Sequence, residues 1–242
     1  GCAPEQTVRK IFLDSYTREQ TNEGLRYPQA KRALRTMLDE GQLLVNYTGH
    51  GAETNLSNYY LFEMEDLLGQ QNGDRLPVWV TATCEYGRFD DPRRRCGGEL
   101  LLLHEYGAIG VMTAVRKVFS SANQLINKQF YRQLFPCDSL RRPITLGKAY
   151  MEAKNRALSY PINTRCYTLL ADPGLPLARP ALSVRLTGLQ TPTGGDTLRG
   201  LEPVTLTGQV EAGGALAEDF NGQVYITLYD QAAVRQTQIA RY

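Results

Sequence analysis

Two stretches decide the fold of this chain: LLVNYTGHG (residues 43–51) and PVWVTATC (residues 77–84). Each is a short run of apolar and β-branched residues that leads into a turn. Nearly unbroken apolar runs are typical of strands that are covered on both faces of a parallel sheet. The first run ends in His50 and Gly51, and the second ends in Cys84. The sequence therefore predicts two strands that each deliver a chemically active side chain.

The segments around these two strands alternate between helical and strand patterns. Apolar residues recur at helical spacing in several segments, and Gly, Ser or Thr residues mark their ends. Besides the two strands above, we expect strands at 10–13 and 108–115, and helices at 28–40, 59–69, 98–106, 121–135 and 146–158. This order predicts an α/β fold with a mostly parallel sheet and helices on both faces.

The pattern changes near residue 178, after the Pro-rich stretch ADPGLPLARP (171–180). Apolar residues then alternate with polar ones in LSVRL (182–186), VTLTGQV (204–210) and VYITLY (224–229). A period of two with intervening Gly and Thr is typical of antiparallel strands. We therefore expect two domains, 1–178 and 179–242. The second is expected to be a β-sandwich, although about four strands are few for a complete one.

Composition excludes several classes of function. The chain has 242 residues and a net charge of +2, with its basic residues dispersed, which gives no indication of nucleic-acid binding. No apolar window has the length of a membrane helix. Five cysteines leave at least one thiol unpaired in any disulfide scheme. Their spacing, with only two histidines, does not predict a metal site, and no cofactor is expected. The opening GCAPEQTV has no initiator Met, so we expect a piece of a longer protein.

His50 and Cys84 together indicate nucleophilic catalysis. Functional groups gather at the carboxyl ends of parallel strands, and neighbouring strands lie about 4.8 Å apart. An imidazole can take the proton of a thiol and produce the reactive thiolate. The backbone N–H groups of Gly51 and Cys84 are candidates for stabilising the oxyanion. The alternative is that Cys84 is an inert strand-end thiol and His50 a hydrogen-bonding turn residue.

The motifs NYTGHG and TATCEYGRF resemble those of the gingipain family of caspase-like cysteine peptidases. The resemblance extends over residues 10–178 through YPQAKRALRTMLDEGQLLVNYTGHG, GELLLLHEYGAIGVMTAVRKVFSSAN, LGKAYMEAKN and YTLLADPGLPL. Within the family, TATCEYGRFDDP, TAVRKVFSSAN and TPTGGDTL with FNGQVY resemble the PorU-type sortases of the bacterial type IX secretion system.

This resemblance implies a caspase-like fold followed by an immunoglobulin-like domain, with His50 and Cys84 as the catalytic dyad. It implies an enzyme at the cell surface, associated with the outer membrane. Its substrates would be exported proteins with C-terminal sorting domains. Its acceptor would be anionic lipopolysaccharide, and its partner an outer-membrane β-barrel protein (PorV-like). The alternatives are a secreted gingipain-like endopeptidase and a catalytically silent scaffold that binds partners.

Residues close to Cys84 are the candidates for substrate contacts. Glu85 and Tyr86 follow the thiol directly, and Arg116 lies in the strand region 111–119, which we expect to run beside it. Arginines 93–95 could meet phosphates or carboxylates of an anionic acceptor. The alternative is that these charged residues form ion pairs and turns at the surface.

Overall fold

The computed structural model describes residues 6–136, 143–178, 180, 182–195, 197–226 and 228. The chain divides into two compact units, Gly1–Ala178 and Arg179–Tyr242. The first unit contains both of the stretches that carry the candidate active residues.

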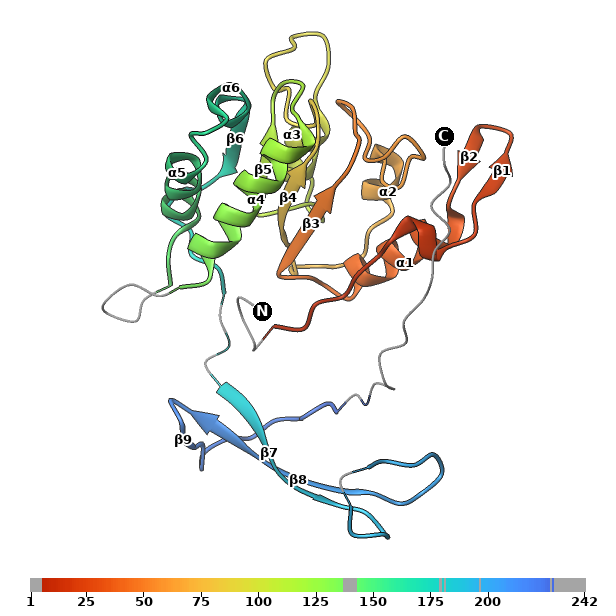
Figure 1. Cartoon of the computed structure of the whole chain (residues 1–242), viewed down its shortest axis with the longest axis vertical. Helices are drawn as coiled ribbons and strands as arrows, with labels where there is room; N and C mark the ends of the chain where they lie inside the picture. Colours follow the sequence, from red (N-terminus) through yellow and green to blue (C-terminus); the bar gives the residue numbers. More distant parts are fainter. Residues whose placement is uncertain are drawn as a thin grey trace. The chain divides into compact units, whose positions relative to one another are not determined.

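A four-stranded sheet forms the centre of the first unit (Figure 1). Its order is β3 (Leu44–Thr48), β4 (Val78–Ala82), β5 (Gly110–Ala114) and β6 (Tyr167–Ala171). The first three strands are parallel, and β6 pairs with β5 in the antiparallel sense. All residues of β4 and β5 are buried, which explains their unbroken apolar character. The expected mostly parallel sheet is confirmed.

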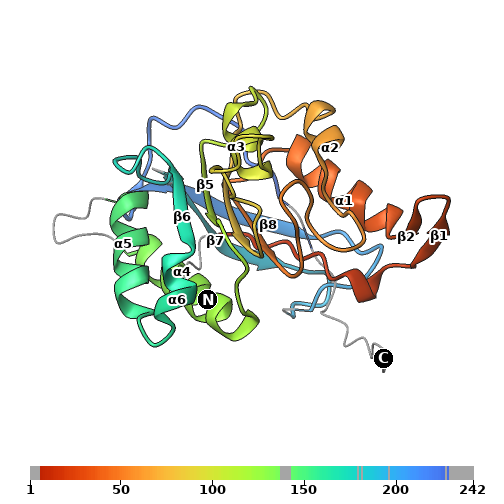
Figure 2. The same ribbon diagram turned by 90° about the horizontal axis from the view of Figure 1, so that it is seen from above.

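Helices cover both faces of this sheet (Figure 2). On one face lie α1 (Pro28–Asp39), α2 (Met64–Leu68) and α3 (Gly97–Leu103), which pack around Trp79 and Val111. On the other face lie α4 (Ser120–Leu134) and α5 (Leu146–Arg156), which pack on Val80 and Met112. Alternate residues of one strand thus enter opposite cores, as the side-chain period of two requires.

Several elements differ from those expected. Residues 10–13 form no strand, and a 3₁₀ turn, η1 (Leu13–Ser15), and a small hairpin of β1 (Glu19–Thr21) and β2 (Gly24–Arg26) follow. The helix expected at 59–69 shortens to α2, because Ser57 and Tyr60 have positive φ and the chain turns there. A short helix, α6 (Pro161–Arg165), precedes β6. Neither α6 nor β6 was expected.

The second unit contains a three-stranded antiparallel sheet of β7 (Leu182–Gln190), β8 (Thr205–Ala212) and β9 (Ala215–Leu216). The strand expected at 224–229 is not formed at residues 224–226 and 228, and residues 227 and 229 lie outside the described residues. The immunoglobulin-like sandwich therefore stays a prediction. Within the described part of the chain, no helix has the length and apolar character needed to cross a membrane.

Candidate active site

Cys84 and His50 occupy equivalent positions beyond two neighbouring parallel strands. β3 and β4 pair up to Thr48 and Ala82, so each active side chain lies two residues beyond the last paired position. The pairing reaches one step farther, because the Gly49 N–H donates to the Ala82 carbonyl oxygen at 3.4 Å. The structure therefore brings the two candidate residues to the same edge of the sheet.

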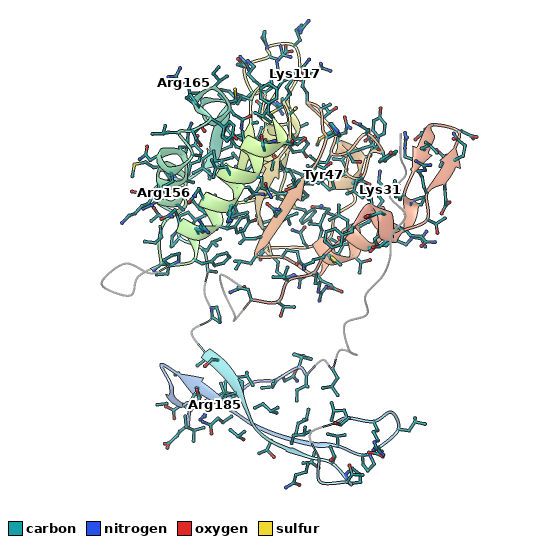
Figure 3. The ribbon with its side chains drawn as sticks, viewed as in Figure 1. Lys31, Tyr47, Lys117, Arg156, Arg165 and Arg185 are labelled. Atoms are coloured by element: carbon teal, nitrogen blue, oxygen red, sulfur yellow. The ribbon has the colours of Figure 1, made fainter. Side chains whose placement is uncertain are left out.

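The backbone of His50 is held from two sides, while its side chain is exposed. Its carbonyl oxygen accepts hydrogen bonds from the Tyr47 hydroxyl at 2.5 Å and from the Ser57 N–H at 2.8 Å. Figure 3 shows Tyr47 on β3, below this turn. Burial raises the pKa of Tyr47 to about 12, so its hydroxyl remains a donor wherever an imidazole titrates. These bonds fix the point at which the imidazole leaves the backbone.

Gly51 lies so close to the end of β4 that no side chain fits. A Cβ at this position would be 2.6 Å from Thr83 Oγ1 and 3.1 Å from the Asn55 carbonyl oxygen. The hydrogen bonds of the isolated β-bridge between Gly51 and Leu56 are donated by neighbouring residues, so the bridge does not use the Gly51 N–H. In the described part of the chain, neither Gly51 nor Cys84 donates a backbone hydrogen bond. Both N–H groups are therefore free to stabilise an oxyanion.

The turn after Cys84 is strained and is tied to the strand beside it. Glu85 has a φ of +56°, in the left-handed region that is unfavourable for residues other than glycine. The Glu85 N–H donates to the Arg116 carbonyl oxygen at 3.3 Å, and the Gly87 N–H donates to that of Ala114 at 3.0 Å. Strain of this kind is common at functional sites. Here it turns the chain sharply just after the thiol.

The Cys84 sulfur lies against the backbone of Val118, beyond the end of β5. The Val118 N–H donates to the sulfur at 3.5 Å, and the thiol donates to the Val118 carbonyl oxygen at 3.6 Å. The thiol is half-buried and in no disulfide. The segment after β5 thus runs beside the candidate nucleophile as expected. The sequence did not indicate that Val118 would contact the sulfur through its backbone.

Tyr86 is fully buried, which corrects its assignment as a substrate contact. Its ring fills the space beside Gly97, where a Cβ would lie 2.3 Å from the ring carbon Cε2. Burial also raises the pKa of its hydroxyl. A side chain without accessible surface has nothing to offer a substrate, so Tyr86 supports the turn from within the core. Glu85, by contrast, remains half-buried at the edge.

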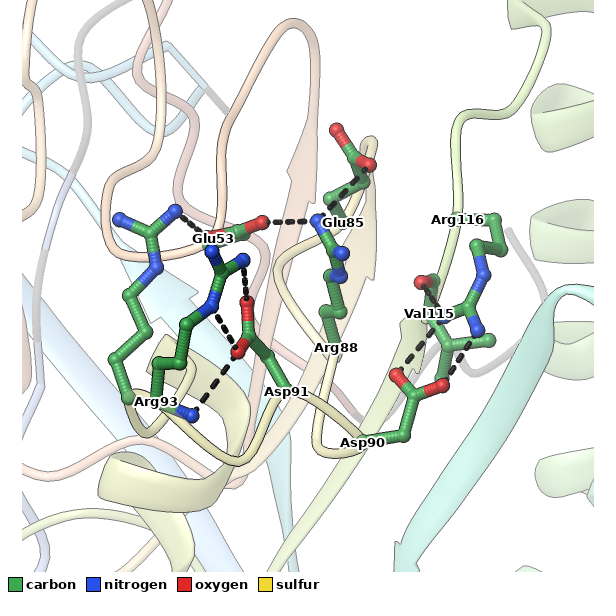
Figure 4. Close-up of polar contacts among 9 residues, drawn as sticks. Glu53, Glu85, Arg88, Asp90, Asp91, Arg93, Val115 and Arg116 are labelled. Atoms are coloured by element: carbon green, nitrogen blue, oxygen red, sulfur yellow. Dashed lines mark hydrogen bonds and ion pairs between the residues drawn. The ribbon is translucent and has the colours of Figure 1, made fainter.

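Several arginines that follow the candidate nucleophile are paired with carboxylates within the chain (Figure 4). Glu53 contacts Arg88 at 2.6 Å and also contacts Arg94. Arg93 donates to both carboxylate oxygens of Asp91 at 3.0 Å. These hydrogen bonds hold the pKa of Asp91 well below its usual range. Two of the three arginines expected to meet an anionic acceptor thus already have carboxylate partners.

Arg116 forms a two-pronged ion pair with Asp90, in which the two N–O distances are 2.9 and 2.5 Å. The hydrogen bonds from Arg116 lower the pKa of Asp90. Arg116 also donates to the Val115 carbonyl oxygen (Figure 4). Its guanidinium must leave Asp90 before it can bind a substrate group. Figure 3 shows the adjacent Lys117 at the end of the sheet toward which β3 and β4 point.

The other described cysteines have different surroundings. Cys96 is buried at the start of α3, and burial raises the pKa of its thiol to about 11. Cys166 is half-buried and contacts the Ile162 carbonyl oxygen at 3.3 Å. Cys84 alone among these three follows a strand of the parallel part of the sheet. Cys2 and Cys137 lie outside the described residues.

Comparison with protein families identifies the first unit. Residues 1–178 match the model of peptidase family C25. The chain belongs to this family. No curated protein matches it.

Similar solved structures agree with this family. A crystal structure of the Arg-specific cysteine proteinase gingipain R (RgpB) has 18% identity and a TM-score of 0.56, covering 64% of this chain and 39% of that one. A complex of the pro- and mature domains of Porphyromonas gingivalis RgpB has 19% identity and a TM-score of 0.55, covering 64% and 40%. A structure described as a protease has 18% identity and a TM-score of 0.54, covering 63% and 39%.

These similarities show a caspase-like fold of the gingipain type, as expected from the resemblance of the motifs. The chain spans about two fifths of the length of the solved structures that it matches. At 18–19% identity the likeness concerns the fold.

Proposed function

We propose that the chain carries the active site of a cysteine peptidase that acts as a sortase of the PorU type. The observation that carries this proposal is the equivalent placement of His50 and Cys84 beyond β3 and β4. Three further observations support it. They are membership of peptidase family C25, the N–H groups of Gly51 and Cys84, which bond to no backbone acceptor among the described residues, and the half-buried thiol.

The first half of the reaction forms a thioester. The His50 imidazole accepts the Cys84 proton, and the thiolate attacks the carbonyl carbon of the scissile peptide bond. Negative charge develops on the carbonyl oxygen, where the N–H groups of Gly51 and Cys84 donate to it. His50 then gives its proton to the leaving amine. The carbon–nitrogen bond breaks, the sorting domain leaves, and the exported protein remains attached to the sulfur.

The second half decides between a transferase and a hydrolase. An acceptor amine attacks the thioester, loses its proton to His50, and forms an amide as the thiolate leaves. Water attacking in the same way forms a free acid. An acceptor held beside the thioester gains an effective concentration of about 10⁵ M or more, so a sortase needs an acceptor site at this edge. We propose anionic lipopolysaccharide as the acceptor.

The proposal of a PorU-type sortase in particular is supported by the motifs after Cys84 and after β5, which resemble those of PorU-type sortases. With it we propose a location at the cell surface, associated with the outer membrane. We also propose substrates with C-terminal sorting domains and an outer-membrane partner of the PorV-like kind. A secreted gingipain-like endopeptidase is the second candidate, because the same dyad serves it with water as the acceptor.

A product analysis separates these functions. The full-length protein is incubated with an exported substrate that carries its sorting domain, with and without a small amine. A new amide that requires Cys84 supports the sortase, and free acid alone supports the endopeptidase. A Cys84→Ala host strain should accumulate exported proteins that retain their sorting domains. Unchanged processing in that strain would contradict the sortase and leave the endopeptidase and the third candidate, a silent scaffold.

A further inference from the structure

The peptide group between Val118 and Phe119 connects the candidate nucleophile to a buried pair of amides. The carbonyl oxygen of this group belongs to Val118 and accepts from the Cys84 thiol at 3.6 Å. Its N–H belongs to Phe119 and donates to Asn163 Oδ1 at 2.7 Å. A trans peptide is planar, and its C=O and N–H point in opposite directions. Whatever fixes the Phe119 N–H therefore also aims the Val118 carbonyl at the sulfur.

The Asn163 side chain is itself held in one orientation. Asn163 and Asn123 are only 4% and 5% exposed, and Asn163 Nδ2 donates to Asn123 Oδ1 at 3.2 Å. Leaving a buried amide group without a partner costs about 1–3 kcal/mol. Turning the Asn163 amide over would lose both of its hydrogen bonds. Its oxygen must consequently face Phe119.

Asn123 completes the arrangement from the first turn of α4. Its backbone N–H donates to the Phe119 carbonyl oxygen at 2.9 Å. Phe119 is thus held at its N–H by α6, through Asn163, and at its carbonyl by α4. The residue before it, Val118, has its own N–H at 3.5 Å from the Cys84 sulfur. Two helices on one side of the sheet therefore converge on the backbone that contacts the thiol.

We propose that Asn163, supported by Asn123, is a positioning residue for the Cys84 sulfur. The inference rests on the proposed role of Cys84 as the nucleophile. A cysteine side chain has several rotamers, and attack on a carbonyl requires one of them. The Val118 C=O holds the protonated thiol, and the Val118 N–H holds the sulfur once the proton has passed to His50, so the sulfur keeps one direction as long as Val118 cannot move. Asn163 supplies that restraint without touching the substrate.

Three variants of the full chain test this role. Asn163→Ala removes the acceptor for the Phe119 N–H. Asn163→Asp keeps an oxygen acceptor there, while rotation of the Asn123 amide presents its Nδ2 to the new carboxyl. Thr164→Val is the matched control. Thr164 is in the same helix and is 4% exposed, and its hydroxyl donates to the Ala157 carbonyl oxygen at 2.9 Å.

Two measurements decide the outcome, both made below the unfolding temperature of every variant. The first is hydrogen exchange of the Val118 amide, which needs no activity. The second is the separation of kcat from KM for cleavage that depends on Cys84. We expect Asn163→Ala to speed Val118 exchange about tenfold or more. We also expect it to lower kcat by about 10- to 100-fold, with KM changed less than about threefold.

Asn163→Asp should restore both values to within about threefold, and Thr164→Val should change neither. Unchanged Val118 exchange in Asn163→Ala would overturn the proposal, as would faster exchange with an unchanged kcat. An equal effect of Thr164→Val would reduce Asn163 to a general packing role and would also overturn it. Failure of the proposed function looks different, because the unsubstituted protein would then show no cleavage that requires Cys84, while the exchange measurement still reports on Asn163.

Discussion

Substitution of Gly51 by alanine tests how the turn that carries His50 is fitted against β4. The new Cβ would lie 2.6 Å from Thr83 Oγ1 and 3.1 Å from Thr83 Cγ2. Ordinary contact begins near 3.4 Å, so one side must retreat by about 0.8 Å. Thr83 is fully buried, whereas His50 in the turn is exposed. The turn is the part that should move.

The magnitude follows from this overlap. Overpacking of a buried contact costs about 1–3 kcal/mol, and we expect Gly51→Ala to lower the free energy of unfolding by this amount. Because the turn carries His50 away from Cys84, kcat/KM should fall by about 30- to 100-fold. Chemical unfolding measures the first effect. The rate of Cys84-dependent cleavage measures the second.

A compensating substitution provides the control. Thr83→Ala removes both of the Thr83 atoms that the new Cβ meets. Within the described part of the chain, Thr83 Oγ1 has no hydrogen-bond partner, so this change breaks no such bond. The free energy of unfolding of the double variant Gly51→Ala/Thr83→Ala should be about 1–2 kcal/mol higher than the sum of the two single-variant effects predicts. The close fit would be refuted if the free energy of unfolding of Gly51→Ala lay within about 0.5 kcal/mol of that of the unsubstituted protein. Strictly additive effects of the two substitutions would also refute it.

Further predictions concern separate parts of the first unit. At neutral pH a small alkylating reagent should modify Cys84 and leave Cys96 unmodified, because burial raises the Cys96 pKa to about 11. Peptide mapping that finds Cys96 modified at a comparable rate would contradict this. Thr145→Ala should lower the free energy of unfolding by about 1 kcal/mol, because Thr145 Oγ1 accepts from the Lys148 N–H at the start of α5. Thermal unfolding measures this loss, and an unchanged unfolding midpoint would contradict the prediction. Arg116→Ala should raise the Asp90 pKa toward its ordinary value, because hydrogen bonds from Arg116 lower it. A carboxyl with a lowered pKa stabilises the fold above its unfolded-state pKa and loses this contribution as the pH falls through its folded-state pKa. The variant should therefore lose less stability on acidification. An unmoved Asp90 titration by NMR would show that the ion pair does not persist in solution.

The order of the main helices and strands could be predicted from the sequence because it depends on local patterns. The apolar runs before His50 and Cys84 are buried strands, and their polar ends meet at one edge because parallel neighbours end together. The start of α5 could also be predicted, because a Gly, Ser or Thr at the end of a helical pattern is a local signal, and Thr145 caps this helix. These features require no knowledge of distant contacts.

The features that could not be predicted depend on contacts between distant segments. Tyr86 follows the thiol and resembles a site residue in sequence, but the small Gly97 on α3 leaves space for its ring in the core. β6 is a short run whose antiparallel pairing is set by the position of β5. Arg116 and Asp90 meet only because the turn after Cys84 folds back along the segment after β5. Asn163 lies in a helix too short to show a helical pattern.

The measurement that tests the central claim most directly is the pH dependence of covalent modification at Cys84, compared between the unsubstituted protein and His50→Ala. If the imidazole takes the proton of the thiol, His50→Ala should slow the site-specific modification of Cys84 at neutral pH about tenfold or more and should change how that rate depends on pH. Superimposable rate profiles for the two proteins would contradict the account.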